Sequence, residues 1–95
     1  MFDKIKDLYK LTSQMKEIKK QLDDTIIEVE SDNRLFTISI SGSQEIRDVK
    51  ITGDISKLGT DEIAKTLKNI INKAIRDSQA TAAAQMSKLT GLGGQ

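Results

Sequence analysis

The spacing of the apolar residues changes twice along this chain of 95 residues. In the first segment, apolar residues recur three and four positions apart, at Leu8, Leu11, Met15, Ile18 and Leu22. This spacing predicts a helix over about residues 2–23 with one narrow apolar seam, as in helices that pair with other helices. From Thr25 the apolar residues alternate with polar ones, and after residue 60 the helical spacing returns. The order of these periods favours a fold in which helices accompany a small sheet.

The alternating segment predicts two strands, over about residues 25–30 and 35–41, joined by the polar turn at 31–34. In the second strand, hydroxyl side chains separate three apolar residues, Phe36, Ile38 and Ile40. One face of the sheet is therefore expected to be apolar and the other polar, as in an antiparallel sheet that is covered on one side.

A third strand is predicted over about residues 46–52. It places Val49 and Ile51 on one face, whereas Ile46 falls among the polar positions, which predicts a β-bulge near the start of the strand. A loop should follow, and hydroxyl and acidic residues then begin a second helix over about residues 60–89.

These elements form a single α+β domain over residues 1–89: a helix, a three-stranded antiparallel sheet and a long helix. The glycine-rich residues 90–95 are expected to be a flexible tail. Helices of roughly 30 to 40 Å extend beyond strands of about 20 Å, so their apolar ends need another partner. We expect an intertwined homodimer, with the seam of the first helix at the interface: Leu8, Leu11, Met15, Ile18 and Leu22.

Cysteine and histidine are absent, which excludes disulfides, zinc sites, thiol nucleophiles and histidine-based triads. No remaining residues combine a nucleophile with a base that works at neutral pH, so we expect no enzyme, cofactor, metal site or small-molecule substrate. The carboxylates Glu28, Glu30 and Asp32 are interpreted as an exposed sheet edge. The chain has no apolar run near 20 residues and no apolar core of a signal peptide, so we expect a cytoplasmic protein without a membrane contact.

Positive charge is concentrated on the two helices, although the net charge is only +1. Residues 25–52 hold three basic and five acidic side chains, whereas residues 63–76 hold four basic side chains and no acidic one. Lys65, Lys68 and Arg76 are expected near one stripe of the second helix. Two interpretations stay open, a solvated helix surface and a surface that binds a polyanion. For the second, the candidate residues are Lys6, Lys10, Lys16, Lys19, Lys20, Lys65, Lys68, Lys73 and Arg76.

Three segments of the chain are familiar: Phe36-Thr-Ile-Ser-Ile-Ser-Gly42, Ile46-Arg-Asp-Val-Lys-Ile51 and Met86-Ser-Lys-Leu-Thr-Gly91. With the lysine-rich first helix, they resemble the YbaB/EbfC family of bacterial nucleoid-associated proteins over nearly the whole chain. Members of this family usually carry glycines before the second strand, where this chain has Asp32-Asn33-Arg34. The resemblance implies a tight, tweezers-shaped homodimer that binds duplex DNA in the cytoplasm and contributes to nucleoid organisation or gene regulation.

The sequence thus predicts a nucleoid-associated protein that binds double-stranded DNA by replacing condensed cations along the phosphates. Little sequence specificity is expected, because the chain offers few arginine, asparagine or aromatic side chains for reading bases. The alternative is an adaptor whose paired helices grip a partner protein without contacting DNA, which the modest net charge would permit.

Overall fold

The structure, a computed structural model, describes the backbone of residues 2–90 and the side chains of residues 8–88. From residue 91 on, the predicted flexible tail lies outside the described residues. The elements follow in the order α1 (Phe2–Asp24), β1 (Ile26–Glu30), β2 (Phe36–Ser41), β3 (Ile46–Ile51), the short 3-10 helix η1 (Ile55–Lys57) and α2 (Thr60–Thr90). The predicted α+β arrangement of two helices and a three-stranded antiparallel sheet is confirmed.

The three strands form an antiparallel sheet in the order β1-β2-β3. Ile38 at the centre of β2 lies opposite Val29 on one side and Val49 on the other. The register between β2 and β3 shifts after Ser39, so that Ile40 pairs with Ile46. The predicted bulge is therefore confirmed, and it returns Ile46 to the apolar face of the sheet.

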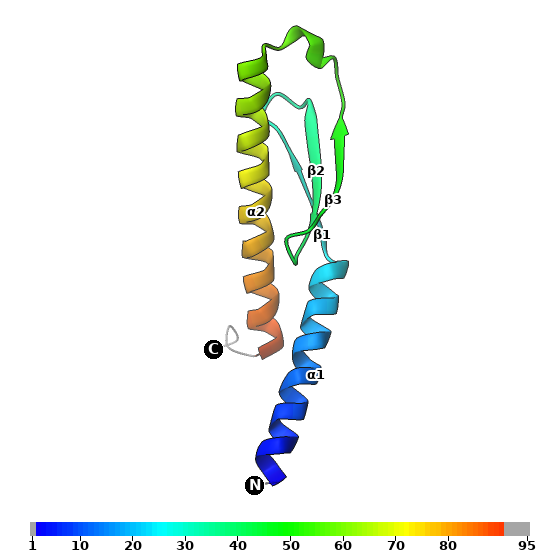
Figure 1. Cartoon of the computed structure of the whole chain (residues 1–95), viewed down its shortest axis with the longest axis vertical. Coiled ribbons are helices and arrows are strands. Elements are labelled where there is room, and N and C mark those ends of the chain that lie inside the picture. Colours follow the sequence, from blue (N-terminus) through cyan, green and yellow to red (C-terminus); the bar gives the residue numbers. More distant parts are fainter. Residues whose placement is uncertain (1, 91–95) are drawn as a thin grey trace.

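One helix, α2, covers the apolar face of the sheet (Figure 1). It packs against β1 and β2. Residues from the sheet and from α2 form the buried core, namely Val29, Phe36, Ile38, Ile40, Ile70 and Ala74. Ile55 of η1 packs against this core, as expected for an anchored loop.

The other helix, α1, leaves the end of the sheet and projects away from it (Figure 1). Thr25 alone separates α1 from β1, and one residue is too short to turn a helix back over the sheet. The molecule is consequently elongated, 66 Å in its longest dimension and 25 Å in the next.

Hydroxyl groups fix α1 and α2 to the turn between β2 and β3. The Ser78 hydroxyl of α2 donates to the carbonyl oxygen of Ser41 at 2.8 Å, and both residues are fully buried. The hydroxyl of Ser41 lies 2.8 Å from that of Ser43, which donates to the Asp23 carboxylate at the end of α1. The polar face of β2 is therefore more buried than its alternating sequence predicts. Ser41 is buried because it lies where the ends of α1 and α2 meet the turn after β2.

The turn between β1 and β2 contains the left-handed residue Arg34, with φ of 62°. Glycine adopts this conformation without strain, whereas a residue with a Cβ atom does so at a cost. The Asn33 side-chain oxygen accepts hydrogen bonds from the Ser31 hydroxyl and the Leu35 amide, and the Thr52 hydroxyl donates to the Arg34 carbonyl at 2.7 Å. Local hydrogen bonds thus hold a conformation that arginine alone disfavours.

Candidate nucleic-acid interface

A row of polar side chains follows the solvent side of α2. Lys65, Asn69, Asn72 and Arg76 are spaced by four, three and four residues, and all four are exposed. Asn72 lies two residues from the buried Ile70, about 200° around the helix from it. These four residues, which we name the α2 ridge, therefore form an exposed line on α2 outside the buried contact with the sheet.

A polar hollow of about 600 Å³ lies between α2 and the turn after β1, and all four residues of the α2 ridge line it. Its lining includes three cations, Lys65, Lys73 and Arg76. The carboxylates in its lining are equal in number, Glu30, Asp32 and Glu62. The formal charges in the lining therefore balance, and the three carboxylates oppose the entry of a phosphate group deep into the hollow.

The structure separates the cations that the sequence assigned to one stripe. Lys65 and Arg76 line the hollow together with Lys73, whereas Lys68 is exposed outside it. The sequence analysis also missed Asn69 and Asn72, which lie among these cations with the same helical spacing. The spacing itself was the available signal, because it places Asn69 and Asn72 between Lys65 and Arg76 on one line of α2.

The cations of α2 are free of intramolecular ion pairs. In the part of the chain that the structure describes, the ion pairs are Arg34 with Glu30 at 3.9 Å and Arg47 with Glu45 at 3.2 Å. Both join residues of the sheet and its turns, and neither involves the helical cations. No carboxylate of the described residues therefore competes at close range with a partner for the exposed lysines of α1 and α2.

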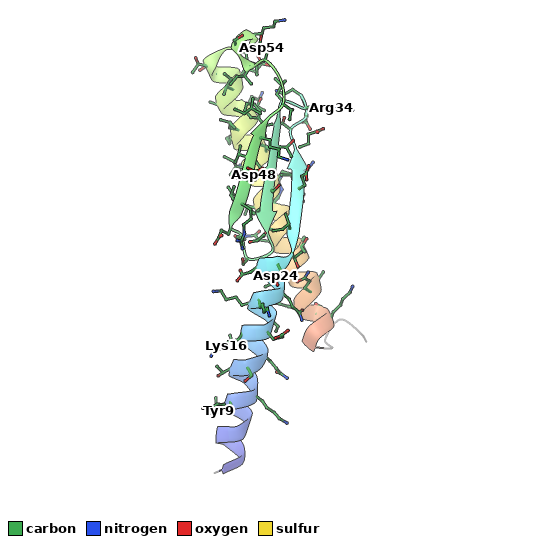
Figure 2. The ribbon with its side chains drawn as sticks, turned by 90° about the vertical axis from the view of Figure 1, so that its right-hand side faces the viewer. Tyr9, Lys16, Asp24, Arg34, Asp48 and Asp54 are labelled. Carbon is green, nitrogen blue, oxygen red and sulfur yellow. The ribbon has the colours of Figure 1, made fainter. Side chains whose placement is uncertain are left out.

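On α1, four candidate lysines are exposed, Lys10, Lys16, Lys19 and Lys20. The fifth, Lys6, lies in α1, but its side chain is outside the described residues. Tyr9 and Lys16 project from the same side of α1 (Figure 2). This side is opposite the apolar seam, because Tyr9 and Ile18 are nine residues, about two and a half turns, apart. The helix therefore presents an apolar and a cationic side.

The apolar seam of α1 is only partly covered. Leu8, Leu11 and Met15 are all more than half exposed, whereas Ile18 and Leu22 near the sheet are half-buried. The candidate interface residues of α1 thus form two groups: three that lie open to solvent and two that contact the rest of the chain in part.

A second apolar surface lies on β3. Ile46, Val49 and Ile51 share the face of the sheet that α2 covers elsewhere, yet each is about half exposed. Ile71 of α2 is also exposed. Thr66 marks the flank of α2 that lies beside β1, because it lines the hollow there, and Ile71 lies on the opposite flank. The flank of Ile71 therefore faces the β3 side. We name Ile46, Val49, Ile51 and Ile71 the β3 patch.

The described residues were also compared with the requirements of a metal site and of a membrane span. Among the described residues, no three acidic side chains gather where they could hold a metal ion. None of the described helices is both long and apolar enough to span a membrane. The pKa of the Asp54 carboxyl is lowered by hydrogen bonds from the hydroxyl and amide of Ser56, but this exposed group caps η1.

The sequence of the chain is similar to those of known proteins. A model of the YbaB/EbfC DNA-binding family matches residues 1–93. A nucleoid-associated protein of Prochlorococcus marinus is 29% identical over 94 residues, which cover 95% of this chain and 81% of that protein. Another, from Dictyoglomus thermophilum, is 30% identical over 81 residues, covering 85% and 75% of the two chains.

The fold also matches a solved structure. The crystal structure of an uncharacterized protein from Helicobacter pylori superposes with a TM-score of 0.78 and covers 95% of this chain and 97% of that one. The two sequences are 14% identical, so this similarity concerns the fold alone.

Proposed function

Since the chain belongs to the YbaB/EbfC DNA-binding family, we propose that it binds duplex DNA as a homodimer, mainly through phosphate contacts from its helices. Its relatives carry the name nucleoid-associated protein, which supports the nucleoid as its location and nucleoid organisation or gene regulation as its role. Because phosphates are the same in every sequence, binding should extend over most duplexes.

The observation that carries this proposal is the unpaired positive charge on the outer side of α2. Between Ile63 and Arg76 the helix carries four cations and no carboxylate, and Lys65, Lys68 and Arg76 are exposed without an ion pair. When such side chains approach phosphates, they release condensed counterions, which favours binding through entropy. The α1 lysines extend the same charge along the elongated molecule.

Two apolar surfaces support the homodimer. The α1 seam and the β3 patch each expose large aliphatic side chains, and monomeric soluble proteins rarely leave such contiguous surfaces open. Burying both would bring the interface toward the 2,000 Å² or more of an obligate dimer. A dimer also doubles every cationic surface and fixes the distance between the copies, which suits the regular spacing of phosphates.

The test is a gel-shift titration of the full chain with an unselected 20-base-pair duplex over a range of salt concentrations. If a dimer neutralises about six phosphates, the logarithm of the affinity should fall with the logarithm of salt at a slope near −5. The double variant Lys65→Glu/Lys68→Glu should weaken binding at low salt by roughly tenfold or more and flatten this slope.

A matched control is Lys50→Glu/Lys57→Glu, which changes two exposed lysines on the sheet and η1 by the same total charge. Equal weakening by both double variants would contradict a contact on α2 and indicate an effect of net charge alone. Absence of duplex binding by the intact wild-type dimer would overturn the proposal and favour the protein adaptor.

A further inference from the structure

The α2 ridge has the side chains that read base edges as well as those that bind phosphates. Asn69 and Asn72 lie at its centre, between Lys65 and Arg76. In the described part of the chain, the side chain of neither asparagine makes an intramolecular hydrogen bond. Their amide donors and acceptors are therefore available to a partner.

An exposed helix ridge with these groups fits the major groove of duplex DNA. A carboxamide can bond at once to N6 and N7 of adenine, and a guanidinium can bond to O6 and N7 of guanine. From Lys65 to Arg76 the ridge is about 16 Å long, which corresponds to roughly five base pairs. The major groove is wide enough to admit an α-helix whose opposite side is packed on a sheet.

Two lysines flank the asparagines symmetrically. Lys68 precedes Asn69 by one residue and Lys73 follows Asn72 by one, so each lies about 100° around the helix from its neighbouring asparagine, on opposite sides of the ridge. When the ridge enters a groove, the flanking lysines face the two phosphate backbones that border it. Amides at the centre and cations at both sides match the division of such contacts into base edges, which specify, and phosphates, which position.

Carboxylates limit how the duplex can approach. Glu30 and Asp32 line the hollow on the same side of the ridge as Lys73. They repel a phosphate backbone on the side of Lys73, whereas Lys68, on the other side of the ridge, lies outside the hollow and away from these two carboxylates. One orientation of the ridge in the groove is thus favoured over the others, and a fixed orientation is a condition for sequence preference.

We propose that the α2 ridge reads base edges in the major groove, with Asn69 and Asn72 selecting adenine and Arg76 selecting guanine, so that the protein prefers particular short sites within its general affinity for DNA. This inference rests on the proposed DNA binding and assigns the residues that determine its specificity.

The experiment is selection from a random duplex library with the wild-type chain and with Asn69→Ala/Asn72→Ala. Alanine preserves the helix and removes only the carboxamides. The wild type should enrich a short site that contains adenine and bind it roughly five- to hundredfold more tightly than a shuffled duplex. The double variant should bind the two duplexes within about twofold of each other, while keeping most of its affinity for the shuffled one. Thermal unfolding of both proteins verifies that the fold is retained.

The matched control is Lys68→Ala on the same helix. Loss of this cation should weaken binding to both duplexes equally, reduce the salt dependence and leave the enriched site unchanged. If the wild type binds DNA but enriches no site, or if the asparagine variant enriches the same site, the inference is wrong while the proposed function stands. If the wild type binds no duplex, both fail together.

Discussion

β2 and β3 are neighbouring strands of six residues, and each places three large apolar side chains on the same face of the sheet, yet their burial is opposite. Five residues of β2 are buried and the sixth is half-buried, whereas all six residues of β3 are exposed. Ile38 and Val49 lie opposite each other in the ladder and share one face of the sheet. Ile38 is 2% exposed and Val49 is 51% exposed.

The difference shows that strand pairing determines which face a side chain shares but does not determine whether that face is covered. α2 packs over β1 and β2, the first two strands of the sheet. The apolar face extends further, onto β3, where α2 does not cover it. A central strand is also shielded by neighbours on both sides, whereas an edge strand has only one. The uncovered part of a core face is a natural contact for a second copy of the chain.

The largest effect should come from the buried strand. Ile38→Ala is expected to lower the free energy of unfolding by about 2–5 kcal/mol, because it removes buried methyl groups and leaves a cavity under α2. Ile26→Ala makes the same change at an edge-strand position that is 52% exposed, and it should cost less than about 1 kcal/mol. Urea unfolding at one protein concentration compares them. Similar losses for the two variants would refute the contrast between covered and uncovered positions.

A second prediction concerns the exposed strand. Val49→Asp should weaken dimerisation by about 2 kcal/mol or more, roughly thirtyfold, because a carboxylate in the β3 patch would be buried without a partner. Ile26→Asp is the matched control, since it introduces the same charge on the other edge strand at nearly equal exposure. Sedimentation over a range of micromolar concentrations measures both. If Val49→Asp dimerises like the wild type, the β3 patch is not in the interface. The α1 seam would then be the remaining candidate, and Leu11→Asp tests it.

The smallest effect should arise at the turn that joins the two strands. A Cβ atom on Gly42 would lie 3.0 Å from the Leu22 carbonyl oxygen and 3.3 Å from its Cα atom. Gly42→Ala should therefore push the end of α1 away from the turn and destabilise the fold by about 1–2 kcal/mol. Gly59→Ala has nothing within 4 Å and should change stability by less than about 0.5 kcal/mol. Equal thermal midpoints for the two variants would show that α1 is held loosely at this turn.

Much of the fold was predictable, because its elements differ in local period. The heptad-like spacing of α1 and the alternation in β2 need no tertiary information to be recognised. Even the bulge was evident, since Ile46 breaks the alternation that Val49 and Ile51 continue. The burial of Ser41 was not predictable, because a small hydroxyl residue at the end of a strand gives no sign that two helices meet there.

The candidate site was predictable in part for a related reason. Charge is a property of single residues, so the lysines of both helices could be identified from the sequence. Which of them share a surface depends on how α2 is rotated over the sheet. That rotation brings Lys65 and Arg76 to the hollow and leaves Lys68 outside it. It also brings Asn69 and Asn72 to the hollow with their side chains exposed, and these uncharged residues could not be found from a count of charges.

The sequence by itself determined the elements, their order and the apolar side of each, because these follow from backbone preferences and from residue spacing within a few turns. Only the tertiary structure decided which apolar sides meet. Ile70 of α2 is buried on the sheet, whereas Leu8 of α1 is 62% exposed, although both belong to helical apolar stripes. The cause is geometric: a loop through η1 returns α2 across the sheet, while the single residue Thr25 directs α1 away from it.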